Sequence, residues 1–169
     1  SLTVGNGQAV SGTTFTTPVG TTTTYESGIY LEKTTINSGG GNVYLSGTSS
    51  GTDATLAFGI LTHDVSSVNS GSGTITIKGG TGSNTVRGMV VGIRYSNQPG
   101  SLTLTSSSTQ TTAIDIDCRS ASNYGLTFEG TFDLISTQSG GISYTTIGSS
   151  ATAGTRIGFS NNPGTLNIL

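Results

Sequence analysis

A pair made of glycine and a large apolar residue recurs along the chain at a nearly constant spacing. It occurs five times, at intervals of 31, 33, 33 and 33 residues. The five pairs are Gly28-Ile29, Gly59-Ile60, Gly92-Ile93, Gly125-Leu126 and Gly158-Phe159. A fixed period of this length is typical of a protein built from stacked repeats, each of which contacts its neighbours. This period constrains the fold more than any local pattern does.

Short runs that alternate apolar with polar residues follow the glycine pairs. One polar residue separates Val43 from Leu45, and one separates Ile75 from Ile77, which places each apolar pair on one face of a strand. Runs this short are stable only when they stack on the same run one repeat away, as parallel strands about 4.8 Å apart. The sequence therefore predicts an all-β fold, a parallel β-helix (β-solenoid) of about five coils of roughly 33 residues.

Glycine-rich segments separate the predicted strands. The cluster at 39–41 and the Pro-Gly pairs at 99–100 and 163–164 predict corners, formed by glycines with positive φ or by turn chemistry. Residues 97–104 match residues 161–168 at an offset of 64. This match predicts that the third and fifth coils are a shortened variant of the others.

The first 27 residues lack the repeat and are rich in threonine. A solenoid needs an atypical first coil, because an uncovered core and strand edge promote aggregation. We expect residues 1–27 to be an N-terminal cap or an inter-subunit arm, and residues 28–169 to be the solenoid repeats. The chain does not open with methionine and stops inside the strand-like run 166–169. We therefore expect a processed chain or a fragment of a longer one.

Charged residues are scarce in this chain. Lys, Arg, Asp and Glu make up 8% of it, with six basic residues and a net charge of −2, whereas about 25% is usual. Binding to nucleic acid depends on clustered Lys and Arg, and a membrane helix needs about 20 apolar residues. The longest apolar run is only residues 89–93. We expect neither nucleic-acid binding nor membrane insertion, and a surface of hydroxyls and amides.

Two segments carry a resemblance to a known family. Residues 28–52, GIYLEKTTINSGGGNVYLSGTSSGT, and residues 59–83, GILTHDVSSVNSGSGTITIKGGTGS, are similar to the repeats of filamentous-haemagglutinin-type exoproteins and related bacterial surface proteins. For residues 28–169 the resemblance implies a right-handed parallel β-helix, secreted and extracellular or at the cell surface, that serves as a fibre, adhesin or toxin-delivery stalk. The implied partners are other copies of the chain or neighbouring repeats. The family's N-terminal secretion domain has no match here.

Some polysaccharide lyases and hydrolases are also parallel β-helices, so the acidic residues are candidates for catalysis. Asp115 and Asp117 lie two apart on one strand face, where two carboxylates can act as acid and base or hold a calcium ion. The favoured interpretation is a solvated outer face beside Arg119, with Ile114 and Ile116 in the core.

The only histidine, His63, precedes Asp64. Adjacent residues on a strand point to opposite faces, so the two are not expected to form a catalytic pair. The Gly-His-Gly and Arg-Ile-Lys motifs of polygalacturonase-type β-helices do not occur. We predict that the protein is not an enzyme, and we assign it no catalytic, cofactor-binding or metal-binding residue and no cofactor.

The remaining hypotheses concern surfaces. Tyrosines at predicted outer or loop positions suit stacking on glycans, which makes a carbohydrate-binding or glycan-processing domain the alternative to a structural or adhesive module. The tyrosines are Tyr25, Tyr30, Tyr44, Tyr95 and Tyr124. Ice binding needs the same threonine pair in every coil, and Asn42 with Tyr44 breaks that pattern. The single cysteine, Cys118, is expected to be buried as a small apolar residue.

Overall fold

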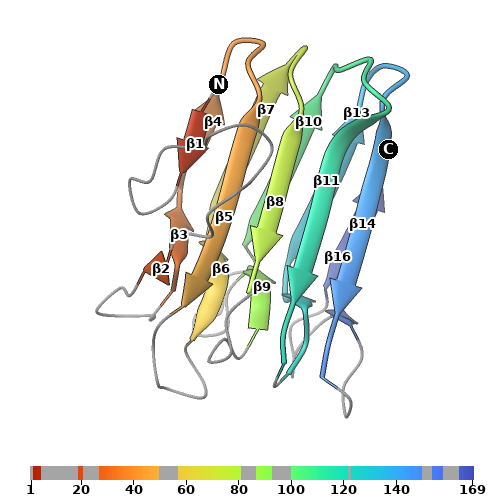
Figure 1. The fold of residues 1–169 in the computed structure, drawn as a ribbon. Helices are drawn as coiled ribbons and strands as arrows, with labels where there is room; N and C mark the ends of the chain where they lie inside the picture. Colours follow the sequence, from red (N-terminus) through yellow and green to blue (C-terminus); the bar gives the residue numbers. More distant parts are fainter. Residues whose placement is uncertain are drawn as a thin grey trace.

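The computed structural model describes residues 2–4, 19–20, 27–49, 57–80, 87–92, 100–121, 123–149, 154–157 and 164–169. These residues form strands and turns, and none of them lies in a helix. All the strands pair in parallel. They form three sheets, in which each strand lies beside strands from the previous and the next repeat (Figure 1).

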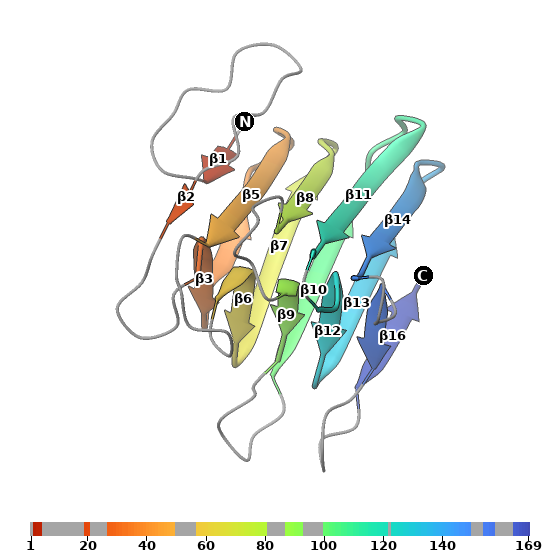
Figure 2. The same ribbon diagram turned by 60° about the horizontal axis from the view of Figure 1, so that its bottom comes forward.

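The chain visits the three sheets in a repeating order. Sheet I contains β1 (Leu2–Val4), β2 (Val19–Gly20), β5 (Val43–Ser49), β8 (Ile75–Gly79), β11 (Thr112–Arg119) and β14 (Gly141–Ile147). Sheet II contains β4 (Thr35–Asn37), β7 (Val65–Gly71), β10 (Ser101–Ser106), β13 (Thr131–Ser136) and β16 (Thr165–Ile168). Sheet III, visible in Figure 2, contains β3 (Ile29–Glu32), β6 (Phe58–His63), β9 (Arg87–Val91), β12 (Leu126–Phe128) and β15 (Thr155–Ile157).

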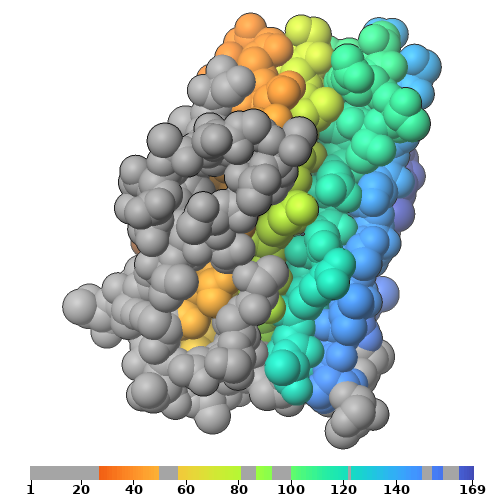
Figure 3. Space-filling model, viewed as in Figure 1, coloured from red at the N-terminus to blue at the C-terminus, as the bar shows by residue number. Residues whose placement is uncertain are grey.

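This arrangement confirms the predicted all-β parallel β-solenoid. The space-filling view shows segments of sheet I succeeding one another across one face in sequence order (Figure 3). The predicted number of about five coils is not confirmed, and the fifth predicted start, Gly158-Phe159, lies outside the described residues.

Ladders of aliphatic side chains fill the space between the sheets. Two inward columns run along sheet I, one through Val43, Ile75, Ile114 and Ile142 and the other through Leu45, Ile77, Ile116 and Tyr144. All of these except Ile142 and Tyr144 are buried. This burial confirms the predicted inward faces of these strands. Burying one such aliphatic side chain contributes about 1.5–3 kcal/mol, so the two columns carry much of the stability.

The repeat register in sheet III differs from the prediction. Ile29 is aligned with Ile60, as expected, but Ile60 is aligned with Met89, followed by Leu126 and Thr155. The offsets between these neighbours are 31, 29, 37 and 29 residues. The period of 33 is therefore an average, because a ladder requires matched strands but leaves the connecting segments free to vary in length.

One predicted repeat start is consequently wrong. Gly88, which precedes Met89, occupies the third start instead of Gly92. Gly92 instead follows the end of β9 with a φ of 91°. There it forms a corner at the end of the sheet III strand.

The predicted shortening of the third coil is also wrong. Residues 101–104 and 165–168 do share a register in sheet II, with β13 between them. However, β10 stacks on β7, whereas the strand that continues β8 is β11. The coil that the prediction shortened has the longest of the four offsets, 37 residues between Met89 and Leu126.

The recurring glycine at the repeat start is required by close backbone contact. A Cβ atom at Gly59 would lie 2.3 Å from the backbone nitrogen of Gly80 and 2.4 Å from the carbonyl oxygen of Gly88. Real Cβ atoms do not approach backbone this closely. Gly47 of β5 and Gly88 of β9 both face this position with their backbone, and only glycine allows strands of sheets I and III to pack so closely here.

The Asn-Ser-Gly triplets form the turn between sheets II and I. The Asn37 and Asn69 side-chain oxygens accept hydrogen bonds from the amides of Gly39 and Gly71, which have φ of 63° and 58°. The Ser70 hydroxyl donates to the carbonyl of the last glycine of its turn at 2.7 Å. The predicted use of positive-φ glycines at corners is confirmed here, whereas Pro99 and Pro163 lie outside the described residues.

Two short segments near the N-terminus pair with the first long strand of sheet I. Leu2 is aligned with Val43 in β1, and Val19 with Thr48 in β2, both in parallel. They lie along the edge of β5 that faces away from β8. The assignment of residues 1–27 as a cap or arm remains a prediction, because most of that segment lies outside the described residues.

A carboxylate should destabilise the protein much more on the inward face of β8 than on its outward face. Ile75→Asp should lower the free energy of unfolding by at least about 3 kcal/mol, because Ile75 is fully buried and the new charge lacks a partner. Thr76→Asp should cost only about 1 kcal/mol or less, because Thr76 faces outwards. Repulsion from its ladder neighbour Asp115 accounts for that small cost. Urea unfolding of both variants measures the difference, and equal losses would mean that the face assignment is wrong.

Candidate functional site

The acidic pair on β11 lies on the outer face of sheet I, as the favoured interpretation predicted. Ile114 and Ile116 are fully buried, while Asp115 and Asp117 are partly exposed. The Arg119 guanidinium donates two hydrogen bonds to the Asp117 carboxylate, at 2.6 and 2.8 Å. This pairing raises the pKa of Arg119 and occupies the Asp117 oxygens that an acid-base or calcium role would use.

The expectation that the side chains of His63 and Asp64 point to opposite faces is wrong. The Nδ1 atom of His63 lies 3.6 Å from Oδ2 of Asp64, so the two side chains lie on the same side of the chain. The reason is backbone conformation, because Asp64 has a φ of 55° at the corner between β6 and β7. The alternation of faces holds only within a regular strand, and Asp64 lies outside one.

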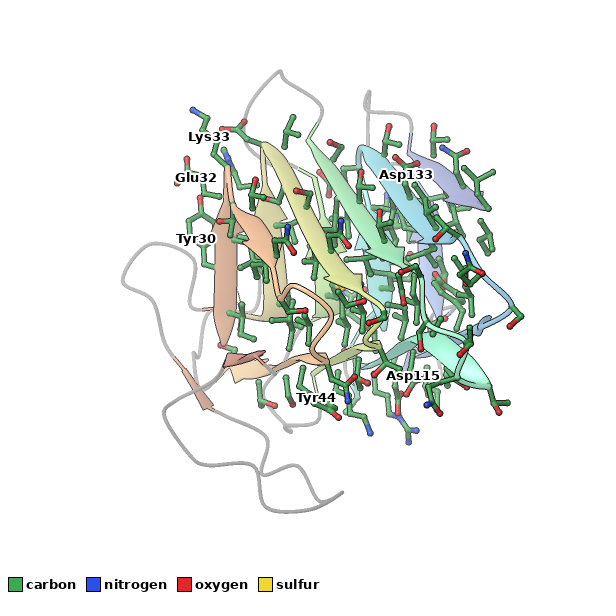
Figure 4. The ribbon with its side chains drawn as sticks, turned by 90° about the horizontal axis from the view of Figure 1, so that it is seen from above. Tyr30, Glu32, Lys33, Tyr44, Asp115 and Asp133 are labelled. Carbon is green, nitrogen blue, oxygen red and sulfur yellow. The ribbon has the colours of Figure 1, made fainter. Side chains whose placement is uncertain are left out.

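A second carboxylate reaches His63 from the neighbouring coil. Glu32 is the ladder partner of His63 in sheet III, and its Oε1 lies 3.8 Å from Nδ1 of His63. Lys33 has a φ of 46°, and its ammonium group lies 3.4 Å from Oδ2 of Asp64. We call Glu32, Lys33, His63 and Asp64 the corner cluster. Figure 4 shows Glu32 and Lys33 together at the end of β3, near Tyr30.

The signal for this cluster in the sequence is the coil-to-coil offset and not a local motif. Applying the 31-residue offset of Ile29 and Ile60 to the next residues places Glu32 beside His63 and Lys33 beside Asp64. Among the described residues, Glu32, His63 and Asp64 are the only group of three whose potential metal-ligand atoms lie within 4.8 Å of one another. Asp115 and Asp117 belong to no such group in that part of the chain.

Two of the five tyrosines expected at the surface pack against other side chains. The Tyr30 ring is tilted against His63, with centroids 6.2 Å apart, and packs on the buried group of Phe58, Leu61 and Val90. The ring of Tyr124 is covered by Arg156, whose guanidinium carbon lies 5.4 Å from its centroid. Both rings are thus engaged within the molecule, and Tyr25 and Tyr95 lie outside the described residues.

Tyr44 is placed differently, because it is hydrogen-bonded to Asn42, which lines an open polar groove of about 510 Å³. Its hydroxyl oxygen accepts a hydrogen bond from the amide of Asn42, at 3.2 Å. It lies on the same side of the molecule as Asp115, to which Thr76 connects it along the ladder (Figure 4). The groove is lined by Gly40, Asn42, Ser72, Gly73, Thr74, Gln110, Thr111 and Thr112.

The outer threonines do not form a continuous ladder. In sheet II the outward column containing Thr103 also contains Ser67, Asp133 and Asn167. Asp133 accepts hydrogen bonds from Thr103 at 3.4 Å and from Asn167 at 2.7 Å. These bonds link successive coils through mixed polar groups, so the repeated threonine pair that ice binding requires is interrupted here.

Two charged residues are buried that the sequence analysis did not single out. Arg87 and Glu129 are 3% and 1% exposed. The Arg87 guanidinium carbon lies 5.9 Å from the centroid of the Phe58 ring, within range of a cation-π contact. Charged residues are expected at the surface unless paired, and nothing in the local sequence of either residue distinguishes it from a surface position.

Comparison of the chain with protein-family models, with curated proteins and with solved structures gave no match. The resemblance to filamentous-haemagglutinin-type repeats therefore remains a prediction. Within the described residues, no helix has the length and apolar character needed to cross a membrane.

Cys118 is fully buried, as predicted, with its sulfur 3.9 Å from that of Met89. Burial raises the pKa of the Cys118 thiol from 9.0 to about 12. At pH 8 the native protein should therefore react with iodoacetamide at least about 100-fold more slowly than the protein in urea, since the thiolate is the reactive form. Mass spectrometry of timed samples measures the rate, and equally fast labelling of the native chain would contradict this burial.

The raised pKa of Cys118 predicts that the folded protein loses stability in alkali. Between pH 9 and 12 the unfolded chain releases the Cys118 proton while the folded chain retains it, so the folded state is penalised as the pH rises through this window. Cys118→Ala should reduce this dependence. Urea unfolding at pH 8 and pH 10 provides the comparison.

Proposed function

We propose that this chain is a structural or adhesive module of a secreted surface protein or extracellular filament, and that it assembles by stacking one solenoid end on another. The observation that carries the proposal is the open end formed by β14, β15 and β16. These three strands are the last members of sheets I, III and II. Among the described residues, no further strand pairs with them (Figure 1).

Among the described residues, part of the core is exposed at this end. Ile157 and Ile168 occupy inward columns, in which their ladder neighbours Phe128 and Leu134 are fully buried. Ile157 is nevertheless 60% exposed and Ile168 56% exposed. Contiguous exposed apolar groups next to unpaired strands mark a surface that gains free energy when another strand layer covers it.

The open end also lacks the usual protection of a strand edge. Natural edges are blocked by charged residues, proline or bulges. The three terminal strands contain one charged residue, Arg156, and its guanidinium group lies over Tyr124. The presence of only one charged residue in strands β14 to β16 supports stacking in preference to a solvated end.

At the opposite end, β3 and β4 are the last members of sheets III and II among the described residues. Parallel stacking of the open end of one copy on this end of the next is a heterologous contact, which continues without closing. A second copy of this chain is therefore the partner that we propose, and a filament is the expected product. The predicted five coils, right-handed twist and extracellular location belong to the same proposal.

The wild-type chain should form particles whose mass rises with concentration, measured by sedimentation velocity and electron microscopy. The double variant Ile157→Lys with Ile168→Lys should remain monomeric, because two charges at the open end oppose stacking. A control with Thr76→Lys and Thr103→Lys adds the same charge on outer faces away from this end and should assemble normally. A monomeric wild-type chain, or equal assembly of both variants, would overturn the proposal.

A carbohydrate-binding module is the second candidate, favoured by the groove beside Tyr44. Its lining of hydroxyl and amide groups matches the hydrogen-bonding groups of a sugar. The lining residue Asn42 is hydrogen-bonded to Tyr44, whose aromatic ring suits stacking on a sugar. Asp115 lies farther along the same outer face.

We expect wild-type protein to bind a subset of glycans on an array if this candidate is correct, and Tyr44→Ala to lose at least about tenfold in affinity. Tyr124→Ala is the matched control, because its ring lies against Arg156. A reducing-sugar assay with wild-type protein and Asp115→Asn tests for glycan processing. No binding on the array and no released sugar would eliminate this candidate.

A further inference from the structure

The corner cluster brings together three groups that are ligands for metal ions. Glu32 comes from β3, His63 from the end of β6, and Asp64 from the corner that follows it. Stacking of the two coils places Glu32 beside His63, and the positive φ of Asp64 turns its carboxylate to the same side. The cluster therefore depends on both the solenoid register and the corner geometry.

The spacing of the ligand atoms fits one small ion. Nδ1 of His63 lies 3.8 Å from Oε1 of Glu32 and 3.6 Å from Oδ2 of Asp64, and all three atoms lie within 4.8 Å of one another. A tetrahedral zinc ion with ligands at about 2.0–2.2 Å has ligand-to-ligand distances of about 3.3–3.6 Å. Small movements of the half-exposed Glu32 side chain would complete that geometry.

The imidazole is already oriented towards the two carboxylates. The side chain of His63 is 16% exposed and its Nδ1 atom is buried. The ring of Tyr30 packs against it, with centroids 6.2 Å apart. A ligand whose orientation is held by packing loses little freedom when it binds an ion.

We propose that Glu32, His63 and Asp64 bind one divalent transition-metal ion per chain, with zinc as the best-fitting example. An imidazole with two carboxylates suits zinc, cobalt or nickel, whereas calcium and magnesium take oxygen ligands. Three protein ligands leave a fourth position for water. The site links two successive coils, so the ion would also stabilise the solenoid.

Lys33 is the competing cation at this site. Its ammonium group lies 3.4 Å from Oδ2 of Asp64, and its side chain is 75% exposed, so it is free to move into solvent when an ion binds. Removing it discriminates between two roles of the cluster. A metal site should bind more tightly without this charge, whereas a purely ionic network would only lose one of its contacts.

Calorimetric titration of the tag-free full chain with zinc chloride tests the proposal. We expect one ion per chain, with affinity reduced at least about 30-fold by His63→Gln and about tenfold by Glu32→Gln or Asp64→Asn. Lys33→Gln should increase affinity several-fold. Because His63 is the only histidine, a cobalt absorption band that disappears in His63→Gln reports this site alone. Asp133→Asn, on a distant outer face, should bind like the wild type.

Circular dichroism distinguishes loss of the site from loss of the fold in each variant. If His63→Gln unfolds, zinc protection of His63 from diethyl pyrocarbonate in the wild-type chain provides the second measurement. Absence of binding to the wild-type chain, or binding that persists at equal affinity in a folded His63→Gln variant, would overturn the proposal. The titration is done at concentrations at which the chain is monomeric, so its outcome does not depend on filament formation.

Discussion

In-register stacking of parallel strands is the constraint on which the rest of this structure depends. Each strand is too short to be stable alone, and each inward side chain is buried by the equivalent side chain of the next coil. Ile75 is fully buried because Val43 and Ile114 lie on either side of it. The same aliphatic type is exposed at Ile168, where the described ladder ends.

Stacking also determines which chemistry the surface can present. Residues that are distant in sequence become neighbours at a separation of one coil, as Glu32 and His63 do. The polar groove beside Tyr44 likewise combines turn residues of three successive coils. A chain with so few charges can therefore still gather a histidine and two carboxylates, provided that the coil lengths bring them into register.

The inward and outward faces of strands were predictable, whereas the coil boundaries were predictable only in part. Alternation along β8 and β11 assigned Ile75, Ile77, Ile114 and Ile116 to the core correctly, because side-chain direction within a strand is a local property. The glycine-apolar pattern predicts a repeat start at Gly92, which precedes Ile93. The ladder instead uses Gly88, whose role depends on backbone contacts from other coils.

By itself, the sequence determined the fold class, the inward faces and the burial of Cys118, because composition, alternation and approximate periodicity act through local propensity and hydrophobicity. Only the tertiary structure decided the register of each coil, the corner cluster and the open end. Coils of unequal length stack wherever their ladders match, and the positive φ of Asp64 reverses a side chain that strand alternation would direct away from His63. The register depends on contacts between residues about one coil apart, which no local pattern encodes.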